Sequence, residues 1–191
     1  MKDVQTKNIA VFLDRDGTIN KDKGYICNSA DLEIYSYAAD AIKEIKGRGY
    51  KVLVATNQAC IARAICTEQQ VQDIHEKMDR VLRSTGATID RFYYSPYHEE
   101  GVIPEFTMSH SWRKPLPGML LQGAEDFDLD LSRSYMVGDS ARDIIAGKNA
   151  GCRTILVMTG HGPKAREELS AQGDEPDFIA ADLQDALQYI E

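Results

Sequence analysis

Short apolar runs that resemble buried strands alternate along this chain with stretches of helical character. This alternation of strand and helix implies a mostly parallel sheet covered by helices on both faces. The sequence therefore predicts an α/β fold of three layers. The predicted strands are 9–13, 51–57, 89–94, 134–139, 152–158 and 178–180, and the predicted helices are 38–46, 67–84, 117–127, 140–150, 165–172 and 183–190.

The length and composition fit a single globular domain over residues 1–191. Hydrophobic residues make up 43% of the chain and charged residues 27%, as in ordinary globular proteins. No apolar run approaches the ~18 residues that a membrane helix needs, and the N-terminus has no secretory signal. We therefore expect a cytoplasmic monomer without a membrane partner. The net charge of −8 argues against a nonspecific nucleic-acid-binding protein, which normally has a basic face.

Two kinds of reactive side chain receive structural interpretations. The four cysteines are scattered and form no C-x-x-C pair, so we expect reduced thiols and no disulfide framework; they are Cys27, Cys60, Cys66 and Cys152. His75 lies inside a predicted helix, and we expect it at the surface or at its boundary.

Two aspartates, Asp14 and Asp16, directly follow the first apolar run. In open α/β sheets the carboxyl ends of the strands face the ligand-binding crevice. Two acidic side chains one residue apart, followed by a Gly-Thr turn, suit a hard divalent cation and an attacking carboxylate. Taken alone, the pair fits a strand that ends in a polar turn equally well.

Three further polar segments follow along the chain, and their order supports a family resemblance. Thr56 and Asn57 end the second strand, Arg113-Lys114-Pro115 precedes a helix, and Gly138-Asp139 ends a later strand. The ordered set resembles the haloacid dehalogenase (HAD)-type phosphatases. That resemblance implies a Rossmann-like three-layer sandwich with a central, mostly parallel sheet and, at this length, no large cap domain.

The resemblance also assigns catalytic roles. Asp14 would attack phosphorus and form an aspartyl-phosphate. Asp16 would protonate the leaving oxygen and later activate the hydrolytic water. Thr56 and Lys114 would hold the phosphoryl oxygens.

A magnesium site is implied at the same strand ends. Its ligands would be the side chains of Asp14 and Asp139 and the backbone carbonyl of Asp16. Two interpretations of Asp143 stay open. It either stabilises the N-terminus of a helix or contacts the metal ligands.

Within the superfamily, the chain resembles the heptose 1,7-bisphosphate 7-phosphatases, with the histidinol-phosphate phosphatases as near relatives. The matching motifs include Phe12–Asn20, Ile61–Arg63 and Tyr135–Asp139. The implied substrate is a small phosphorylated metabolite, with D-glycero-D-manno-heptose 1,7-bisphosphate expected first. Histidinol phosphate or another sugar phosphate is the alternative, and a catalytically idle binding protein is the different class. The positions expected to touch substrate are Asp22, Lys23, Gly24, Tyr25, Asn57, Gln58 and Arg113.

An irregular excursion of the chain spans about 95–113 and either faces the substrate or packs on itself. These relatives usually carry a structural zinc there, bound by a C-x-H … C-x-C pattern. The matching positions here are Ser95, Tyr97, His110 and Trp112. Because a structural site needs about four N or S ligands, we expect no zinc. We expect aromatic packing in its place, involving Phe106, Trp112 and the tyrosines at 93, 94 and 97.

Overall fold

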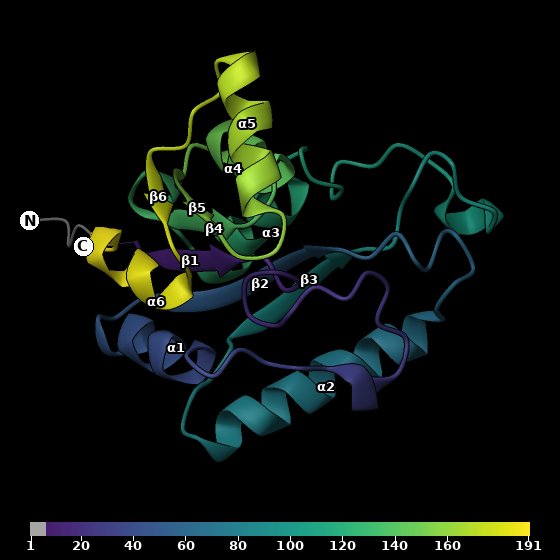
Figure 1. Cartoon of the computed structure of the whole chain (residues 1–191), viewed down its shortest axis with the longest axis horizontal. Helices are drawn as coiled ribbons and strands as arrows, with labels where there is room; N and C mark the ends of the chain where they lie inside the picture. The colour runs from purple at the N-terminus through teal and green to yellow at the C-terminus, as the bar shows by residue number, and fades with distance from the viewer. Residues whose placement is uncertain (1–6) are drawn as a thin grey trace, which may run out of the picture.

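The computed structural model describes residues 7–191, and in this range one sheet of six parallel strands carries helices on both faces (Figure 1). The strand order is β3-β2-β1-β4-β5-β6, so the first strand lies near the middle of the sheet. The strands are β1 Ala10–Leu13, β2 Lys51–Asn57, β3 Arg91–Ser95, β4 Tyr135–Gly138, β5 Arg153–Val157 and β6 Phe178–Ala180. The helices are α1 Ala38–Gly47, α2 Glu68–Ser84, α3 Gly118–Phe127, α4 Ala141–Ala150, α5 Gly162–Gln172 and α6 Leu183–Ala186.

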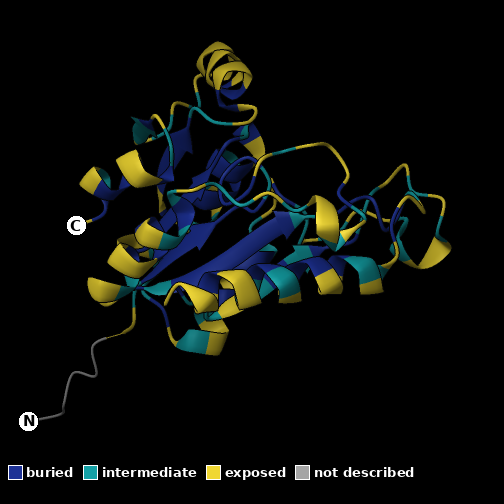
Figure 2. Cartoon of the chain, turned by 60° about the horizontal axis from the view of Figure 1, so that its bottom comes forward, coloured by how far each residue is buried: buried dark blue, intermediate teal, exposed yellow. Residues whose placement is uncertain are grey.

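The side chains of β1 show how the layers are filled. Val11 and Leu13 pack into the core with α1, α2 and α6, whereas Ala10 and Phe12 pack on the other face with α3. All four are fully buried, because helices cover both faces of a parallel sheet. Figure 2 shows the result, with buried strands at the centre and helices exposed on their outer sides. Because both faces of β1 are buried, the apolar run at 9–13 in the sequence is continuous and does not alternate with polar residues.

Local signals explain where most helices begin. The predicted helix over 67–84 begins with a capping box, which the Thr67-Glu-Gln-Gln70 pattern indicates: Thr67 accepts from the backbone of Gln70, and the Gln70 side chain accepts in return. α5 begins at Gly162, three residues before the predicted start, with Pro163 in its first turn, where proline is favoured. The predicted C-terminal helix is shorter than expected, since α6 ends at Ala186 and continues as a 3₁₀ turn. None of the described helices is both long and apolar enough to cross a membrane.

The carboxyl ends of the central strands meet at one edge. The backbone N–H of Asp14 donates to the carbonyl of Val137 over 2.9 Å, which fixes the end of β1 beside the end of β4. The excursion after β3 reaches the same edge, where the N–H groups of Val102 and Ile103 donate to the Ala62 carbonyl. The loops that follow β1, β2, β3 and β4 are therefore brought to one place.

One cysteine pair corrects the expectation from the sequence. Cys27 and Cys66 form a disulfide, so the prediction of reduced thiols is wrong for these two. They lie 39 residues apart in the sequence and meet only because the loop after β1 packs against the loop before α2. Spacing along the chain does not reveal such a pair. Cys60 and Cys152 are free and buried.

Candidate active site

Three carboxylates converge at the carboxyl edge of the sheet. Asp14 follows β1, Asp139 follows β4, and Asp143 lies in the first turn of α4. One carboxylate oxygen from each lies within 4.8 Å of the other two. This geometry confirms the predicted convergence of Asp14 and Asp139, and it adds Asp143 to the group.

Lys114 is the cation inside this group. Its Nζ lies 2.9 Å from Oδ1 of Asp14 and 2.5 Å from Oδ1 of Asp143. The ammonium also donates to the backbone carbonyl of Ala55 over 2.6 Å. Burial alone would lower the pKa of Lys114, but the attraction of Asp14 and Asp143 outweighs it and raises the pKa above its usual value. The side chain therefore stays charged.

One ammonium does not balance three carboxylates. Burial, followed by the repulsion of Asp14 and Asp143, raises the pKa of Asp139 to about 8. Burial likewise raises the pKa of Asp14 to about 6, although Lys114 opposes the shift. A divalent cation would relieve this excess of negative charge. The donors are all oxygen atoms, which is the ligand type that Mg²⁺ prefers, so the residues fit such an ion.

Two glycines leave room for the Asp139 carboxylate. A Cβ atom on Gly17 or on Gly160 would lie only 2.0 Å from its Oδ2 atom. The same oxygen accepts a 2.7 Å hydrogen bond from the backbone N–H of His161. The signal in the sequence for this contact is the Gly160-His161-Gly162 run, which follows a strand end and by itself indicates only a turn.

Asp16 lies beside the cluster and has its own set of donors. Arg15 donates to it through Nε over 3.2 Å and through a terminal nitrogen over 2.7 Å. The side chains of Asn20 and Gln58 donate over 2.9 and 3.1 Å. Burial would raise the pKa of Asp16, but Arg15 and these hydrogen bonds hold it below its usual value.

Several of the residues predicted to bind phosphate or substrate make hydrogen bonds or ion pairs within the protein. The side chain of Asn57 makes two hydrogen bonds to the backbone of Lys114, of 2.9 and 3.0 Å. Gln58 also donates to the Thr56 hydroxyl over 3.0 Å, and both of these side chains are buried. Lys23 contacts Glu33 over 3.1 Å. In this arrangement Asn57 lines the central cavity, whereas Thr56, Gln58 and Lys23 are not among its lining residues.

A cavity of about 420 Å³ opens above the carboxylates. Its floor consists of the acidic group with Asp16 and Lys114. Part of the remaining wall comes from residues that the sequence predicted, and part from residues that it did not. The predicted ones are Asp22, Gly24, Tyr25, Asn57 and Arg113, and the additional ones include Arg63, His98, Arg142 and His161.

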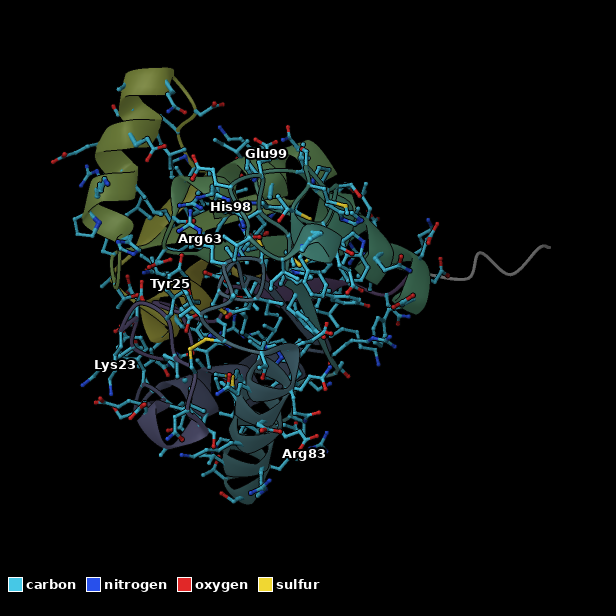
Figure 3. All side chains as sticks on the ribbon, turned by 90° about the vertical axis from the view of Figure 1, so that its right-hand side faces the viewer. Lys23, Tyr25, Arg63, Arg83, His98 and Glu99 are labelled. Carbon is cyan, nitrogen blue, oxygen red and sulfur yellow. A yellow bond between two sulfur atoms is a disulfide. The ribbon has the colours of Figure 1, made fainter. Side chains whose placement is uncertain are left out.

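Arginines dominate one side of the wall. Arg63 donates to the Tyr25 hydroxyl over 2.8 Å, and its other terminal nitrogen lies 3.1 Å from Nε2 of His98 (Figure 3). Arg113 and Arg142 line the same cavity, and burial, followed by the repulsion of Arg142 and Arg63, lowers the pKa of Arg113. The sequence contained a signal for Arg63, in the Ile61–Arg63 motif. Arg142 carried none, because only the fold turns the start of α4 toward this wall.

Aromatic contacts hold the excursion that supplies Arg113 and Lys114. The rings of Tyr97 and His110 stack with centroids 3.9 Å apart, and Phe106 packs edge-on against Tyr97. Trp112 packs edge-on against Tyr93 at 6.1 Å. The predicted aromatic packing is thus confirmed for these residues. Tyr94 packs edge-on against His75, and with Phe106 it also packs against a small cluster that includes Cys60, Ile61 and Val71.

The residues at the zinc positions do not form a four-ligand site. Ser95 has a hydroxyl and Trp112 an indole, and neither is a usual zinc ligand. Nδ1 of His110 already accepts a hydrogen bond from the backbone N–H of Trp112. Within residues 7–191, the one group of three or more acidic, histidine or cysteine side chains close enough to hold a metal is the aspartate cluster.

Comparison with known proteins places this geometry in a family. The HAD-hydrolase-like family matches residues 111–186. The D-glycero-D-manno-heptose-1,7-bisphosphate 7-phosphatase of Thermosynechococcus vestitus is 41% identical over 185 residues, covering 95% of this chain and 94% of the relative. The enzyme named D-glycero-beta-D-manno-heptose-1,7-bisphosphate 7-phosphatase from Escherichia coli K12 is 39% identical over 182 residues, covering 95% and 93% of the two chains.

Solved structures agree with the sequence comparison. A crystal structure of D,D-heptose 1,7-bisphosphate phosphatase from B. bronchiseptica, complexed with magnesium and phosphate, superposes with a TM-score of 0.83. It is 32% identical and covers 97% of this chain and 98% of its own. A HAD-like phosphatase from Mesorhizobium loti gives a TM-score of 0.76 at 38% identity, covering 79% and 73%. With its acidic cluster, buried lysine and parallel sheet, this chain belongs to the HAD superfamily of phosphatases, in the family of the heptose 1,7-bisphosphate phosphatases.

Proposed function

We propose that this phosphatase removes the 7-phosphate of D-glycero-D-manno-heptose 1,7-bisphosphate in a Mg²⁺-dependent reaction. One observation carries the proposal: the cavity that has the carboxylates as its floor is also lined by three arginines. A sugar with two phosphates can place one phosphate on the floor and the other at the arginines. The names and ligands of the relatives support the same substrate class.

Asp14 acts as the nucleophile in this scheme. Its carboxylate attacks phosphorus while the bond from phosphorus to the sugar oxygen breaks, which leaves an aspartyl-phosphate. Asp16 is ionised in the absence of substrate, but an anionic phosphate beside it raises its pKa. It can then carry the proton that it gives to the departing sugar oxygen, so that an alcohol leaves instead of an alkoxide. Lys114 keeps Asp14 ionised and offers its charge to the phosphoryl oxygens.

The second half of the reaction returns the enzyme to its starting state. A water molecule gives a proton to Asp16 as its oxygen attacks phosphorus. The bond between phosphorus and the Asp14 oxygen then breaks, and inorganic phosphate is released. A magnesium ion held by Asp14, Asp139 and the backbone carbonyl of Asp16 would supply positive charge. That charge would reduce the repulsion between the anionic nucleophile and the anionic phosphate.

The arginines distinguish the substrates under consideration. Arg63, Arg113 and Arg142 together favour a second dianionic group, because guanidinium groups bind phosphate oxygens in pairs. Histidinol phosphate carries an ammonium in place of the second phosphate, which this wall would repel. The sequence-based alternative is therefore less well supported than the bisphosphate.

A panel of phosphorylated metabolites tests the proposal. We expect heptose 1,7-bisphosphate to have the highest kcat/KM, with hydrolysis that depends on Mg²⁺ and is abolished in Asp14→Asn. Arg142→Met should raise KM for the bisphosphate and leave the hydrolysis of a sugar monophosphate unchanged. A preference for histidinol phosphate would contradict the substrate assignment. A wild-type protein inactive on every phosphomonoester would favour the idle binding protein.

A further inference from the structure

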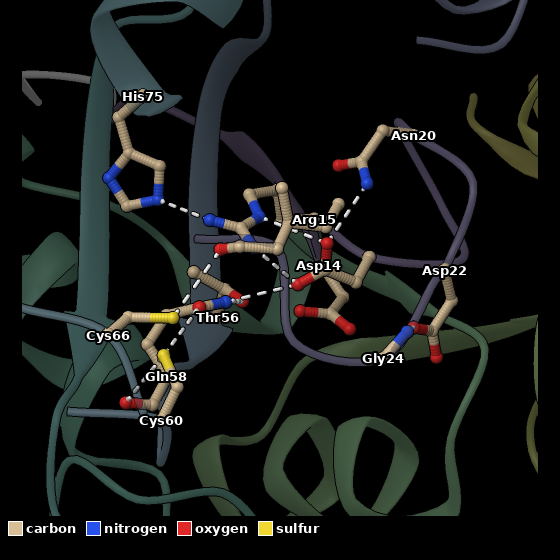
Figure 4. A network of polar contacts seen from close by, with 12 residues as sticks. Asp14, Arg15, Asn20, Asp22, Gly24, Thr56, Gln58, Cys60, Cys66 and His75 are labelled. Carbon is tan, nitrogen blue, oxygen red and sulfur yellow. Dashed lines mark hydrogen bonds and ion pairs between the residues drawn. The ribbon is translucent and has the colours of Figure 1, made fainter. Parts of the chain in front are cut away.

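Arg15 lies buried between two partners, and only one of them belongs to the reaction. Its side chain is 1% exposed. Two of its nitrogens donate to the two carboxylate oxygens of Asp16, and the third, Nη1, lies 3.2 Å from Nε2 of His75 on α2 (Figure 4). The guanidinium thus bridges the active site and a helix on the outer face of the sheet.

His75 was expected near the surface, and the structure corrects this expectation, because the residue is only 6% exposed. Its ring stacks on Phe92 with centroids 4.9 Å apart. A guanidinium group can only donate hydrogen bonds, so Nε2 of His75 must be the unprotonated, accepting nitrogen. Burial, together with the charge of Arg15, lowers the pKa of His75 to about 3, which keeps the ring neutral and able to accept.

The contact with His75 limits how Arg15 can be oriented. A guanidinium is planar and its donors have a fixed geometry. When Nη1 donates to His75, the planar group is held in the rotation in which Nε and Nη2 both face Asp16. Without that acceptor, Nη1 would be a buried donor with no partner at this position, and Arg15 would lower its free energy by turning toward other oxygens.

We propose that His75 is a positioning residue for the phosphatase reaction: through Arg15 it holds the Asp16 carboxyl in the orientation that meets the oxygen of the leaving group. This inference rests on the proposed role of Asp16 as the acid and base. It extends the active site to a helix that does not line the cavity.

Leaving groups of different acidity provide the test. Proton donation matters most when the leaving oxygen is strongly basic, as in an alkyl phosphate, and least for p-nitrophenyl phosphate. His75→Leu should lower kcat/KM for heptose bisphosphate by roughly tenfold to 100-fold, the range expected when a reacting group is displaced by about 1 Å. The same variant should lose much less in kcat/KM on p-nitrophenyl phosphate, because kcat/KM reports the first step, which does not need a proton for this leaving group.

Two further variants separate positioning from packing. His75→Gln keeps a neutral acceptor and should restore most of the activity on the alkyl phosphate. Phe92→Leu removes the stacking partner of His75 but leaves the contact with Arg15, and it should behave as the wild type on both substrates. Should His75→Leu fail to fold, Arg15→Lys retains the charge without the planar fork and should show the same selective loss.

The outcomes are distinguishable. Equal losses of kcat/KM on both substrates, or a glutamine variant no better than the leucine variant, would overturn the positioning role. Wild-type kinetics in a folded His75→Leu or Arg15→Lys protein would overturn it as well. With any of these results, the proposed function still holds as long as the wild type is active and depends on Mg²⁺. A wild type inactive on both substrates would overturn both proposals together.

Discussion

The ammonium of Lys114 lies 2.5 Å from the carboxylate of Asp143, and both side chains are almost completely buried. Asp143 also accepts hydrogen bonds from the backbone N–H and the hydroxyl of Ser140, at the start of α4. The interpretation of Asp143 as a residue at a helix N-terminus is therefore confirmed, and its carboxylate also lies within 4.8 Å of those of the expected metal ligands Asp14 and Asp139. The residue caps a helix, and it holds the lysine that faces the nucleophile.

Removal of that lysine should destabilise the protein strongly. Lys114→Met leaves three buried carboxylates without their cation, and breaking a buried ion pair on one side costs about 3–5 kcal/mol. Urea denaturation in the absence of divalent ions measures the loss. Added Mg²⁺ should recover part of it, since the ion neutralises the same carboxylates.

Lys23→Met provides the matched control. Its ammonium pairs with Glu33 at the exposed surface, where such pairs contribute about 0–1 kcal/mol. Equal effects of the two substitutions would show that the lysine in the cluster has no special electrostatic role.

Asp16→Asn should lower turnover without removing the first covalent step entirely. An amide neither donates a proton as an acid nor accepts one as a base, and such a loss typically costs about 10²–10⁴-fold. With p-nitrophenyl phosphate, whose leaving group needs little protonation, a burst of nitrophenol followed by slow turnover is expected. Stopped-flow absorbance measures both phases. Turnover equal to that of the wild type would exclude Asp16 from the proton transfers.

The sequence predicted the fold well because the determinants of the fold are local. Each strand is marked by its apolar run, and α2 is marked by a capping box that the structure reproduces. The errors lie at element ends, as in α5, where the proline near the start of the helix was overlooked. Neither the apolar runs nor the capping box determines the order of the strands in the sheet. However, parallel strands joined by helices can be ordered in only a few ways.

The candidate site was predictable only in part. Asp14 and Asp139 are separated by 125 positions, yet strand ends bring them together by a general rule of parallel sheets. Arg142 and the Cys27–Cys66 disulfide follow no such rule, because they depend on how particular loops pack. His75 was misplaced for a related reason. A histidine in an amphipathic helix gives no sign that a buried arginine needs its nitrogen.

The stability of the protein should depend on pH through His75. Its pKa is lowered from 6.5 to about 3 in the folded chain, by burial first and then by Arg15, although Asp16 opposes the shift. The unfolded chain therefore binds a proton that the folded chain refuses. This contribution to stability is present above pH 6.5 and is lost as the pH falls toward 3. The loss approaches about 1.4 kcal/mol per pH unit.

His75→Gln isolates this effect, because it retains the acceptor and removes the titration. Between pH 6.5 and 4 the free energy of unfolding of the wild type should fall more steeply than that of the variant. Parallel curves from urea titrations at several pH values would show that His75 is not held neutral. The charged groups that act on the ring are Arg15 and Asp16, and the rings packed against it are those of Phe92 and Tyr94; all four residues are unchanged in the variant.

The aromatic packing of the excursion leads to the last prediction. Since the side chains at the zinc positions do not offer four ligands, elemental analysis should find no stoichiometric zinc, and a zinc-selective chelator should leave the melting temperature unchanged. Trp112→Ala should instead destabilise the protein by a few kcal/mol, because it removes the ring that joins Tyr93 to the excursion. Arg113 follows Trp112 directly, so KM for the bisphosphate should rise as well. Trp112→Phe keeps an aromatic ring there and should restore most of both losses. One tightly bound zinc per chain, with His110 as a ligand, would show that the excursion is held by a metal after all.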